Sequence, residues 1–445
     1  MVVIKDEQWP VARLIPISSA SGTEAQERRA ASALLAVISA VDEFGRALLK
    51  PLGAPAGRIE TFIEVPFKLD GRSIRPDGII TVTKGARTWT AVVETKTGPN
   101  ALDPAQIETY LDLARQLECN AVLSISNQYV TSSTEYPVEI DRRKLKRAAL
   151  HHWSWVDVLT EAVVQKTHRG VSDPDQAYIL AELIRYLSDP RSGAVNFDSM
   201  GPHWTAVRDG ARANTLRKSA PETADVASRW DDLVRYLGLE LTKELGRDVK
   251  LVLAKEERTP AARQQALRES LASTGRLYAD LRVPDSIGPL EIVADLRSRQ
   301  ILVATRIEAP KEGRSRGRVS WLLRQLQSAP GALTVETKAA YTAATLGASL
   351  EAARDSPQML YPEGDKEIRQ FILTFTRNMG VKRNADKGSF IDSVISTTTD
   401  FYGEVLQHLR AWKAPPPKYT KAPEEEEELA LPAPVEAAIE DAKEK

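Results

Sequence analysis

The stretch that decides the fold covers residues 75–96 and reads RPDGIITVTKGARTWTAVVETK. Two runs rich in β-branched residues flank a short polar segment, a pattern typical of two antiparallel strands joined by a tight turn. If Gly85 and Ala86 form a two-residue turn, the numbers of paired residues sum to 171, so Asp77 faces Glu94. Side chains that face each other on neighbouring strands lie about 5 Å apart at Cβ. The sequence therefore predicts two adjacent carboxylates on one sheet.

The same strand predicts a lysine beside these acids. Lys96 stands two residues beyond Glu94 and so points to the same face. The apolar run 91–93 is typical of a strand that is buried on both faces, where an unpaired charge is unfavourable. A shared hard cation such as Mg²⁺ or Mn²⁺ would relieve the repulsion between two acids at this position. A lysine beside the cation can orient a water or stabilise charge on phosphorus. The pattern indicates phosphodiester hydrolysis; the alternative is a turn residue at Asp77 and an ion pair on a solvated strand.

Helices and strands alternate through the first half of the chain. The periodicity predicts helices at about 23–49, 103–118 and 175–187, and strands near 58–68, 75–83, 88–96 and 121–126. This order predicts an α/β domain with a mixed central sheet. Glycine and proline residues within 190–221, which interrupt helices and strands, place the end of this domain at about residue 210.

The motif Pro76-Asp77 followed by Glu94-Thr95-Lys96 resembles the signature of the PD-(D/E)xK nuclease superfamily, which includes restriction endonucleases, Holliday-junction resolvases and RecB-type nuclease domains. The shared core of this family, a helix, a three-stranded meander, a second helix and a fourth strand, matches the predicted order over residues 20–130. The resemblance implies a restriction-endonuclease-like N-terminal domain. It also implies that Asp77 and Glu94 hold Mg²⁺ or Mn²⁺, while Lys96 orients a water that attacks a DNA phosphodiester.

Members of the family commonly take a further acidic ligand from the first helix, where this chain offers Glu24 and Glu27. An apolar stripe at helical spacing turns both toward the interior. Ser21 and Glu24 fit a capping box, which gives Glu24 a structural role. The pair Glu27-Arg28 resembles the acid-Arg pair of resolvase-like members, so we expect Glu27 to be the third catalytic acid and metal ligand.

Two further sets of residues are candidates for substrate binding. Gln106 and Tyr110, one helical turn apart, are similar to the Gln-xxx-Tyr motif of RecB-type members, although a tyrosine at this spacing also fits simple packing. The basic residues Arg142, Arg143 and Lys144 could neutralise phosphates or form a solvated helix face.

Two patterns elsewhere are weaker. His151 and His152 point apart on either a helix or a strand, so we expect packing rather than a metal site. The basic residues between Lys311 and Arg318, interleaved with glycines, could hold phosphate at the start of a helix or form a loop, and we favour the loop.

The second half predicts an α+β domain over residues 220–412. We expect a β-hairpin at 290–296 and 301–307, and helices at 222–245, 319–328, 364–378 and 390–412. This domain would bind substrate, a protein partner or another copy of the chain. The sequence has no phosphate-binding loop and no dinucleotide fingerprint, so we expect no nucleotide cofactor or ATP-driven motor in this chain.

Composition narrows the class of protein. The 445 residues are 42% hydrophobic and carry a net charge of −1, which is typical of a soluble globular protein. One cysteine, Cys119, excludes an internal disulfide, and no apolar leader or membrane span is apparent, so we expect a cytoplasmic protein without a membrane partner. Residues 413–445 contain five lysines and nine acids, which leaves +3 for the rest of the chain and predicts a disordered acidic tail.

Together these features predict a Mg²⁺-dependent deoxyribonuclease, in restriction or antiviral defence by analogy with the family. Two alternatives stay open. One is a DNA-binding or assembly scaffold that keeps a nuclease fold without significant cleavage. The other is a DNA-repair or junction-resolving nuclease, which would differ in the shape of its substrate.

Overall fold

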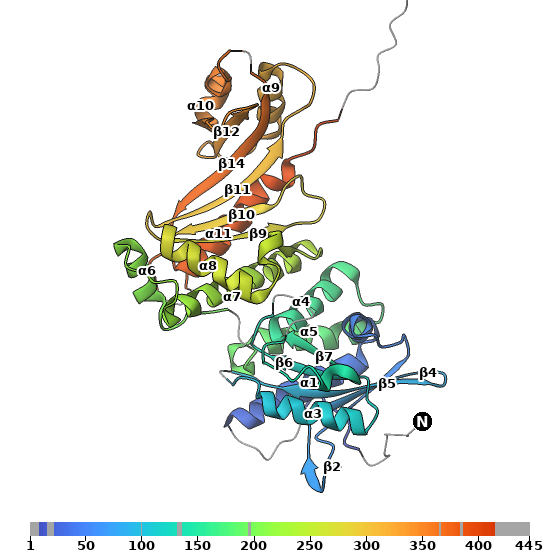
Figure 1. Ribbon diagram of the computed structural model, residues 1–445. Helices are drawn as coiled ribbons and strands as arrows, with labels where there is room; N and C mark the ends of the chain where they lie inside the picture. The colour runs from blue at the N-terminus through green and yellow to red at the C-terminus, as the bar shows by residue number, and fades with distance from the viewer. Residues whose placement is uncertain are drawn as a thin grey trace, which may run out of the picture. The chain divides into compact units, whose positions relative to one another are not determined.

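The predicted hairpin forms the centre of the N-terminal sheet (Figure 1). Strands β4 (Gly78–Lys84) and β5 (Arg87–Thr95) pair antiparallel, and Gly78 lies opposite Val93. The numbers of every pair in this ladder sum to 171, so the predicted register is confirmed. Asp77 and Glu94 directly continue it.

The computed structural model describes part of the chain. The described residues are 9–15, 22–98, 100–130, 136–194, 197–364, 366–382 and 386–413. We call residues 9–194 the N-terminal part and 197–413 the C-terminal part. The predicted acidic tail lies outside the described residues, apart from Lys413.

Strand β5 is the third strand of a five-stranded mixed sheet with the order β1-β4-β5-β6-β7. Its neighbour β4 is antiparallel to it and to β1, whereas β6 and β7 run parallel to β5. The remaining strands of this sheet are β1 (Arg58–Ile63), β6 (Ala121–Ser126) and β7 (Ala149–Ser154). The mixed sheet agrees with the prediction.

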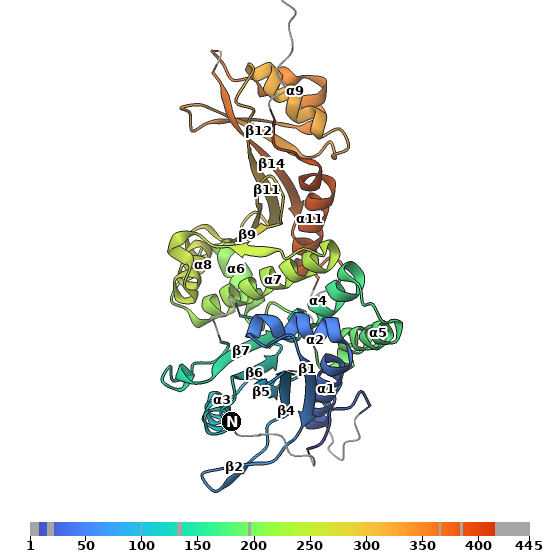
Figure 2. The ribbon, with the colours of Figure 1, turned by 90° about the vertical axis from the view of Figure 1, so that its right-hand side faces the viewer.

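Helices cover both faces of this sheet. Ala91 and Val93 belong to the core that contains α1 (Gly22–Ala40), whereas Val92 belongs to the core that contains α3 (Pro104–Gln116). Figure 2 shows these two helices on opposite sides of the strands. Strand β5 is therefore buried on both faces, as its apolar run predicted. The further helices of this part are α4 (Trp155–Val164) and α5 (Pro174–Ser188).

The structure corrects two predicted elements of the N-terminal part. The single helix predicted at 23–49 is two helices, because Val41 adopts an extended backbone between α1 and α2 (Asp42–Leu49). The strand predicted at 58–68 is interrupted where Glu64 takes a positive φ of 50°. A short hairpin of β2 (Phe67–Leu69) and β3 (Arg72–Ile74) follows.

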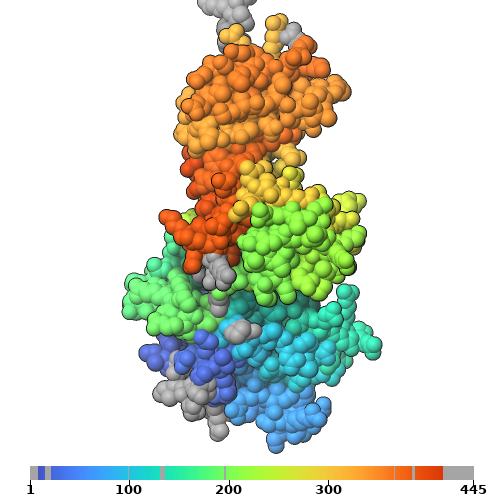
Figure 3. All heavy atoms as spheres, turned by 90° about the vertical axis from the view of Figure 1, so that its left-hand side faces the viewer, coloured from blue at the N-terminus to red at the C-terminus, as the bar shows by residue number. Residues whose placement is uncertain are grey.

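The C-terminal part contains a seven-stranded antiparallel sheet with the order β13-β12-β14-β11-β10-β9-β8. Its strands are β8 (Lys250–Val252), β9 (Arg276–Arg282), β10 (Leu290–Asp295), β11 (Gln300–Glu308), β12 (Thr334–Ala339), β13 (Thr345–Ser349) and β14 (Ile368–Asn378). Its helices are α6 (Trp204–Ala213), α7 (Pro221–Leu245), α8 (Pro260–Thr274), α9 (Ser315–Gln325), α10 (Leu350–Asp355) and α11 (Phe390–Glu404). Strands β10 and β11 form the predicted hairpin. In Figure 3 the segments from α9 to β14 form a continuous orange surface.

The helix predicted at 364–378 is wrong, because this segment forms β14. Phe371, Leu373 and Phe375 are buried at every second position, the period of a strand with one face on the core. The last helix, predicted to reach 412, ends at Glu404. Helix α6, on which the predicted boundary near 210 falls, packs into the C-terminal core.

No helix in the described ranges combines the length and the apolar character needed to cross a membrane.

A close helix contact in the N-terminal part allows a test of packing. A Cβ on Gly45 of α2 would lie 2.2 Å from the carbonyl oxygen of Ile38, far inside van der Waals contact. Alanine favours a helix over glycine by about 1 kcal/mol, but overpacking costs about 1–3 kcal/mol. We therefore expect Gly45→Ala to lower the free energy of unfolding in urea.

The matched control is Gly403 in α11, where the nearest neighbour of an added Cβ is 4.0 Å away. Gly403→Ala should raise the free energy of unfolding by up to about 1 kcal/mol. A stabilising effect of both substitutions would contradict the close contact at Gly45.

Candidate active site

Asp77 is held by the residue that follows its cross-strand partner. Its Oδ2 accepts hydrogen bonds from the backbone N–H of Thr95 at 2.7 Å and from the Thr95 hydroxyl at 2.8 Å. Desolvation raises the pKa of Asp77, although these two hydrogen bonds oppose the rise. Thr95 therefore fixes the orientation of this carboxylate.

Glu94 is the most enclosed acid of the site, with a side chain only 1% exposed. Its Oε1 accepts a hydrogen bond from Lys96 Nζ at 2.6 Å, whereas its Oε2 is buried and has no hydrogen-bond partner among the described residues. Desolvation, followed by the negative charge of Asp77, raises the pKa of Glu94 to about 7. One carboxylate oxygen thus lacks the compensation that buried polar atoms normally receive.

Lys96 lies between two acids. Its Nζ is 2.6 Å from Glu94 Oε1 and 3.7 Å from Glu27 Oε2. Burial acts to lower the pKa of Lys96, but the charge and hydrogen bond of Glu94 outweigh it and the net pKa is raised. The lysine is therefore a cation at neutral pH, suited to stabilising negative charge rather than to accepting a proton.

Of the two acids on α1, Glu27 is the one that faces this cluster. Its side chain is 13% exposed, and its Oε1 accepts a hydrogen bond from Asn100 Nδ2 at 2.7 Å. The side chain of Glu24 is 66% exposed and pairs with Arg28 at 2.7 Å. Ser21, the other member of the predicted capping box, lies outside the described residues.

Gln106 and Tyr110 on α3 reach the same place. The Gln106 amide donates to the Tyr110 hydroxyl at 3.0 Å, and both residues line the pocket that contains Asp77 and Glu94. Burial and the charge of Glu94 raise the pKa of Tyr110, so its hydroxyl stays protonated and can donate a hydrogen bond.

The three basic candidates after α3 do not line this pocket. Lys144 Nζ lies 2.6 Å from Asp112 and 3.5 Å from Glu108, so its charge is already compensated. Arg142 and Arg143 are exposed. The structure brings together the four predicted catalytic residues and the two on α3, but not this basic run.

The pocket has a volume of about 440 Å³ and includes residues beyond the predicted set. Arg75 also lines it, with no ion pair to any described residue, and so offers a free cation. Trp155 Nε1 donates to the backbone oxygen of Lys96 at 2.8 Å. Arg75 and Thr95 stand inside the quoted stretch, whereas nothing in the sequence marks Asn100 or Trp155 as neighbours of the site.

The donor set fits a magnesium ion that is only partly enclosed by protein. Within the described ranges, no three His, Cys, Asp or Glu side chains are grouped closely enough to form a metal site by themselves. Mg²⁺ is usually held by one or two carboxylates, with waters and substrate oxygens completing its shell. Asp77 and the unpartnered oxygen of Glu94 supply such a pair, and Glu27 Oε2 lies 3.7 Å from Lys96 Nζ.

His152, the second of the two adjacent histidines, has structural partners among the described residues. His152 is buried, with Nδ1 2.9 Å from Ser124 Oγ and Nε2 2.9 Å from the carbonyl oxygen of Gln128. Burial lowers its pKa to about 4, so the ring is neutral at physiological pH. Packing, as predicted, accounts for this residue.

Comparison with known proteins gives no relative. No protein-family model matches the chain, and no curated protein and no solved structure is significantly similar to it.

The raised pKa of Glu94 predicts a loss of stability with rising pH. Between the ordinary pKa of 4.5 and about 7, the folded protein binds more protons than the unfolded chain, so the stabilisation is complete below this window and lost across it. A shift of this size corresponds to about 3 kcal/mol. We expect Glu94→Gln to unfold at a higher temperature than the unmodified protein at pH 8 and at nearly the same temperature at pH 4.5.

Glu24→Gln is the control, since this exposed acid lies on the rim of the same pocket. Its thermal midpoint should follow that of the unmodified protein at both pH values. If Glu94→Gln unfolded at a lower temperature at pH 8, Glu94 would not be a buried and strained carboxylate.

Proposed function

We propose that the chain is a Mg²⁺-dependent nuclease that hydrolyses DNA phosphodiester bonds and belongs to the PD-(D/E)xK superfamily. The observation that carries the proposal is the pairing of two desolvated carboxylates, Asp77 and Glu94, with a protonated lysine on paired strands. A buried pair of acids destabilises the chain unless a cation binds to them, because each disfavours ionisation of the other.

The topology supports the same class. Helix α1, the meander of β1, β4 and β5, helix α3 and strand β6 occur in the order that the family shares, with the β2–β3 hairpin inserted between β1 and β4. Strand β6 is parallel to β5. Asp77, immediately before β4, and Glu94, near the end of β5, then come together at the ends of two inner strands.

Three acids of the pocket share one role in this proposal. Asp77, Glu94 and Glu27 would hold one or two metal ions, which when bound activate the attacking water and neutralise the phosphate. Thr95 keeps one oxygen of Asp77 engaged, so that the carboxylate keeps a single orientation.

Four other groups of the pocket would act on the substrate. Lys96 would stabilise the negative charge that develops on phosphorus, since its cationic form is favoured by Glu94. Arg75 would bind a neighbouring phosphate, and Gln106 and Tyr110 would donate hydrogen bonds to the strand being cut. By analogy with stand-alone members of the family, we place the activity in restriction or antiviral defence.

Cleavage of DNA by purified variants tests the proposal. Asp77→Asn and Glu94→Gln keep the shape of each side chain but remove a charged ligand, so both should abolish hydrolysis. Lys96→Ala should lower the rate about 10²- to 10³-fold, as expected when a positioned charge at a reacting centre is lost. Supercoiled, linear and single-stranded DNA would be incubated with Mg²⁺, Mn²⁺ or EDTA and resolved on gels.

Lys144→Ala is the matched control, because this lysine is likewise paired with two acids but lies outside the pocket. Its rate should stay within about twofold of the unmodified enzyme, the effect of a screened surface charge. Metal-dependent cleavage that survives in Glu94→Gln would refute the site.

The two acids of α1 provide a second test. Glu27→Gln should impair cleavage and weaken Mn²⁺ binding in calorimetry, because it removes a charge that faces Lys96. Glu24→Gln should alter both much less, since this acid pairs with Arg28 on the exposed side of the helix. The opposite order of effects would identify Glu24, rather than Glu27, as the third acidic ligand.

A further inference from the structure

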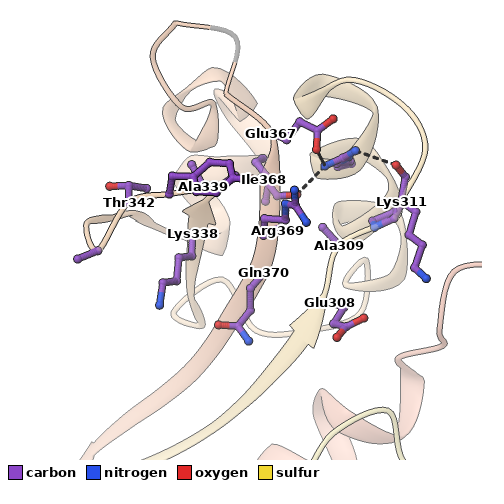
Figure 4. A pocket seen from close by; sticks show the side chains of 15 residues that line it. Glu308, Ala309, Lys311, Lys338, Ala339, Thr342, Glu367, Ile368, Arg369 and Gln370 are labelled. Carbon is purple, nitrogen blue, oxygen red and sulfur yellow. Dashed lines mark hydrogen bonds and ion pairs between the residues drawn. The ribbon is translucent and has the colours of Figure 1, made fainter.

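The C-terminal part contains a second hollow, at the end of its sheet where β11 and β12 stop and β14 begins. Its volume is about 1020 Å³. Glu308, Gln370 and Lys338 form a row across β11, β14 and β12, because Gln370 pairs with both of its neighbours. Figure 4 shows these side chains together with Lys311, which comes from the loop before α9.

The lining of this hollow is positively charged. Lys311, Lys338 and Arg369 are exposed and form no ion pair with any described residue, and the buried Arg318 is a fourth cation. The two carboxylates of the lining are Glu308 and Glu367. Glu367 lies 3.7 Å from Arg318, so it partly compensates the buried cation and leaves the three exposed ones available.

Arg318 holds the walls of the hollow in place. Its side chain is 4% exposed, and it donates hydrogen bonds to the carbonyl oxygens of Ile368 at 2.7 Å and Lys311 at 3.0 Å. A buried guanidinium is stable only when such acceptors surround it. These bonds tie the loop before α9 to the start of β14, which fixes Lys311 and Arg369 on the lining.

An exposed aromatic ring stands on the same lining. Tyr341, between β12 and β13, is 102% exposed, and its backbone has a positive φ of 60°. A left-handed conformation costs a non-glycine residue about 1–2 kcal/mol, and here no packing of the ring offsets it. A ring held in solvent beside unpaired cations is suited to stack on a flat ligand.

We propose that this hollow binds a single-stranded nucleic acid. Lys311, Lys338 and Arg369 would contact successive phosphates, and Tyr341 would stack on an unpaired base. A cationic groove with an aromatic platform is the arrangement that binds single strands without regard to sequence, since every base presents a flat face. A duplex would offer the phosphates but no free base. The inference goes beyond the proposed cleavage and does not depend on it.

Binding of a labelled oligothymidine to the full chain, measured by fluorescence anisotropy in EDTA, tests this site. The triple substitution Lys311→Gln, Lys338→Gln, Arg369→Gln should raise Kd at least about tenfold and flatten the salt dependence by about two units, at about 0.7 per phosphate contact on a single strand. Tyr341→Ala should raise Kd about tenfold, whereas Tyr341→Phe, which keeps the ring, should bind normally.

The matched control removes three exposed cations elsewhere in the C-terminal part, by Lys255→Gln, Arg258→Gln and Arg282→Gln. Its Kd should stay within about twofold of the unmodified chain, as for surface charges distant from bound phosphate. All six positions are exposed, so none of these changes should affect folding, which thermal unfolding would verify.

Three results would overturn the inference. The first is equal weakening by the two triple substitutions, and the second is unchanged binding by Tyr341→Ala. The third is displacement of the oligonucleotide by a duplex or by polyglutamate as readily as by unlabelled oligothymidine, which would indicate a general polyanion or peptide surface. Binding as expected without any Mg²⁺-dependent cleavage would refute the nuclease and leave this site standing.

Discussion

The antiparallel pairing of β4 with β5 is the constraint on which the candidate site depends. A shift of one residue would turn every side chain of one strand to the opposite face, and would separate Asp77 from Glu94. The tight turn and the two cores that receive alternate residues of β5 prevent such a shift, because Val92 fits one core and Val93 the other. The position of the acids is thus set by packing that does not involve them.

Electrostatics within the site oppose this packing. Asp77 and Glu94 are two desolvated carboxylates close to each other. Lys96, which contacts Glu94 and Glu27, compensates their negative charge only in part. The apolar cores of the two faces provide the free energy that keeps the acids together. The desolvated carboxylates lower the stability of the fold at the place where a cation and a phosphate would bind. Such destabilising groups are often found at functional sites.

Much of the N-terminal architecture could be predicted, because its signals are local. The turn at Gly85 and Ala86 and the apolar alternation around it determine the register, and the register determines which acids meet. Contacts made by residues distant in sequence give no such signal, so the sequence does not predict Asn100 or Trp155 as neighbours of the site. The sequence does not predict the break at Val41, because an apolar residue at this position fits a continuous helix as well as a buried kink. In the C-terminal part, the segment of β14 was mistaken for a helix, although its buried residues alternate.

The central place of β5 has a consequence for how the N-terminal part opens. Amide groups in a strand that is paired on both sides and covered on both faces exchange with solvent only when a large cooperative unit unfolds. Glu94 and Thr95 lie at the end of such a strand: both pair with β6, and on the other side the Thr95 N–H donates to the Asp77 carboxylate. Local fraying at the edges of the sheet would leave the acids assembled, and their separation would require loss of the whole unit. The pair of Asp77 and Glu94 would then exist either assembled or not at all, without a population of half-formed pairs.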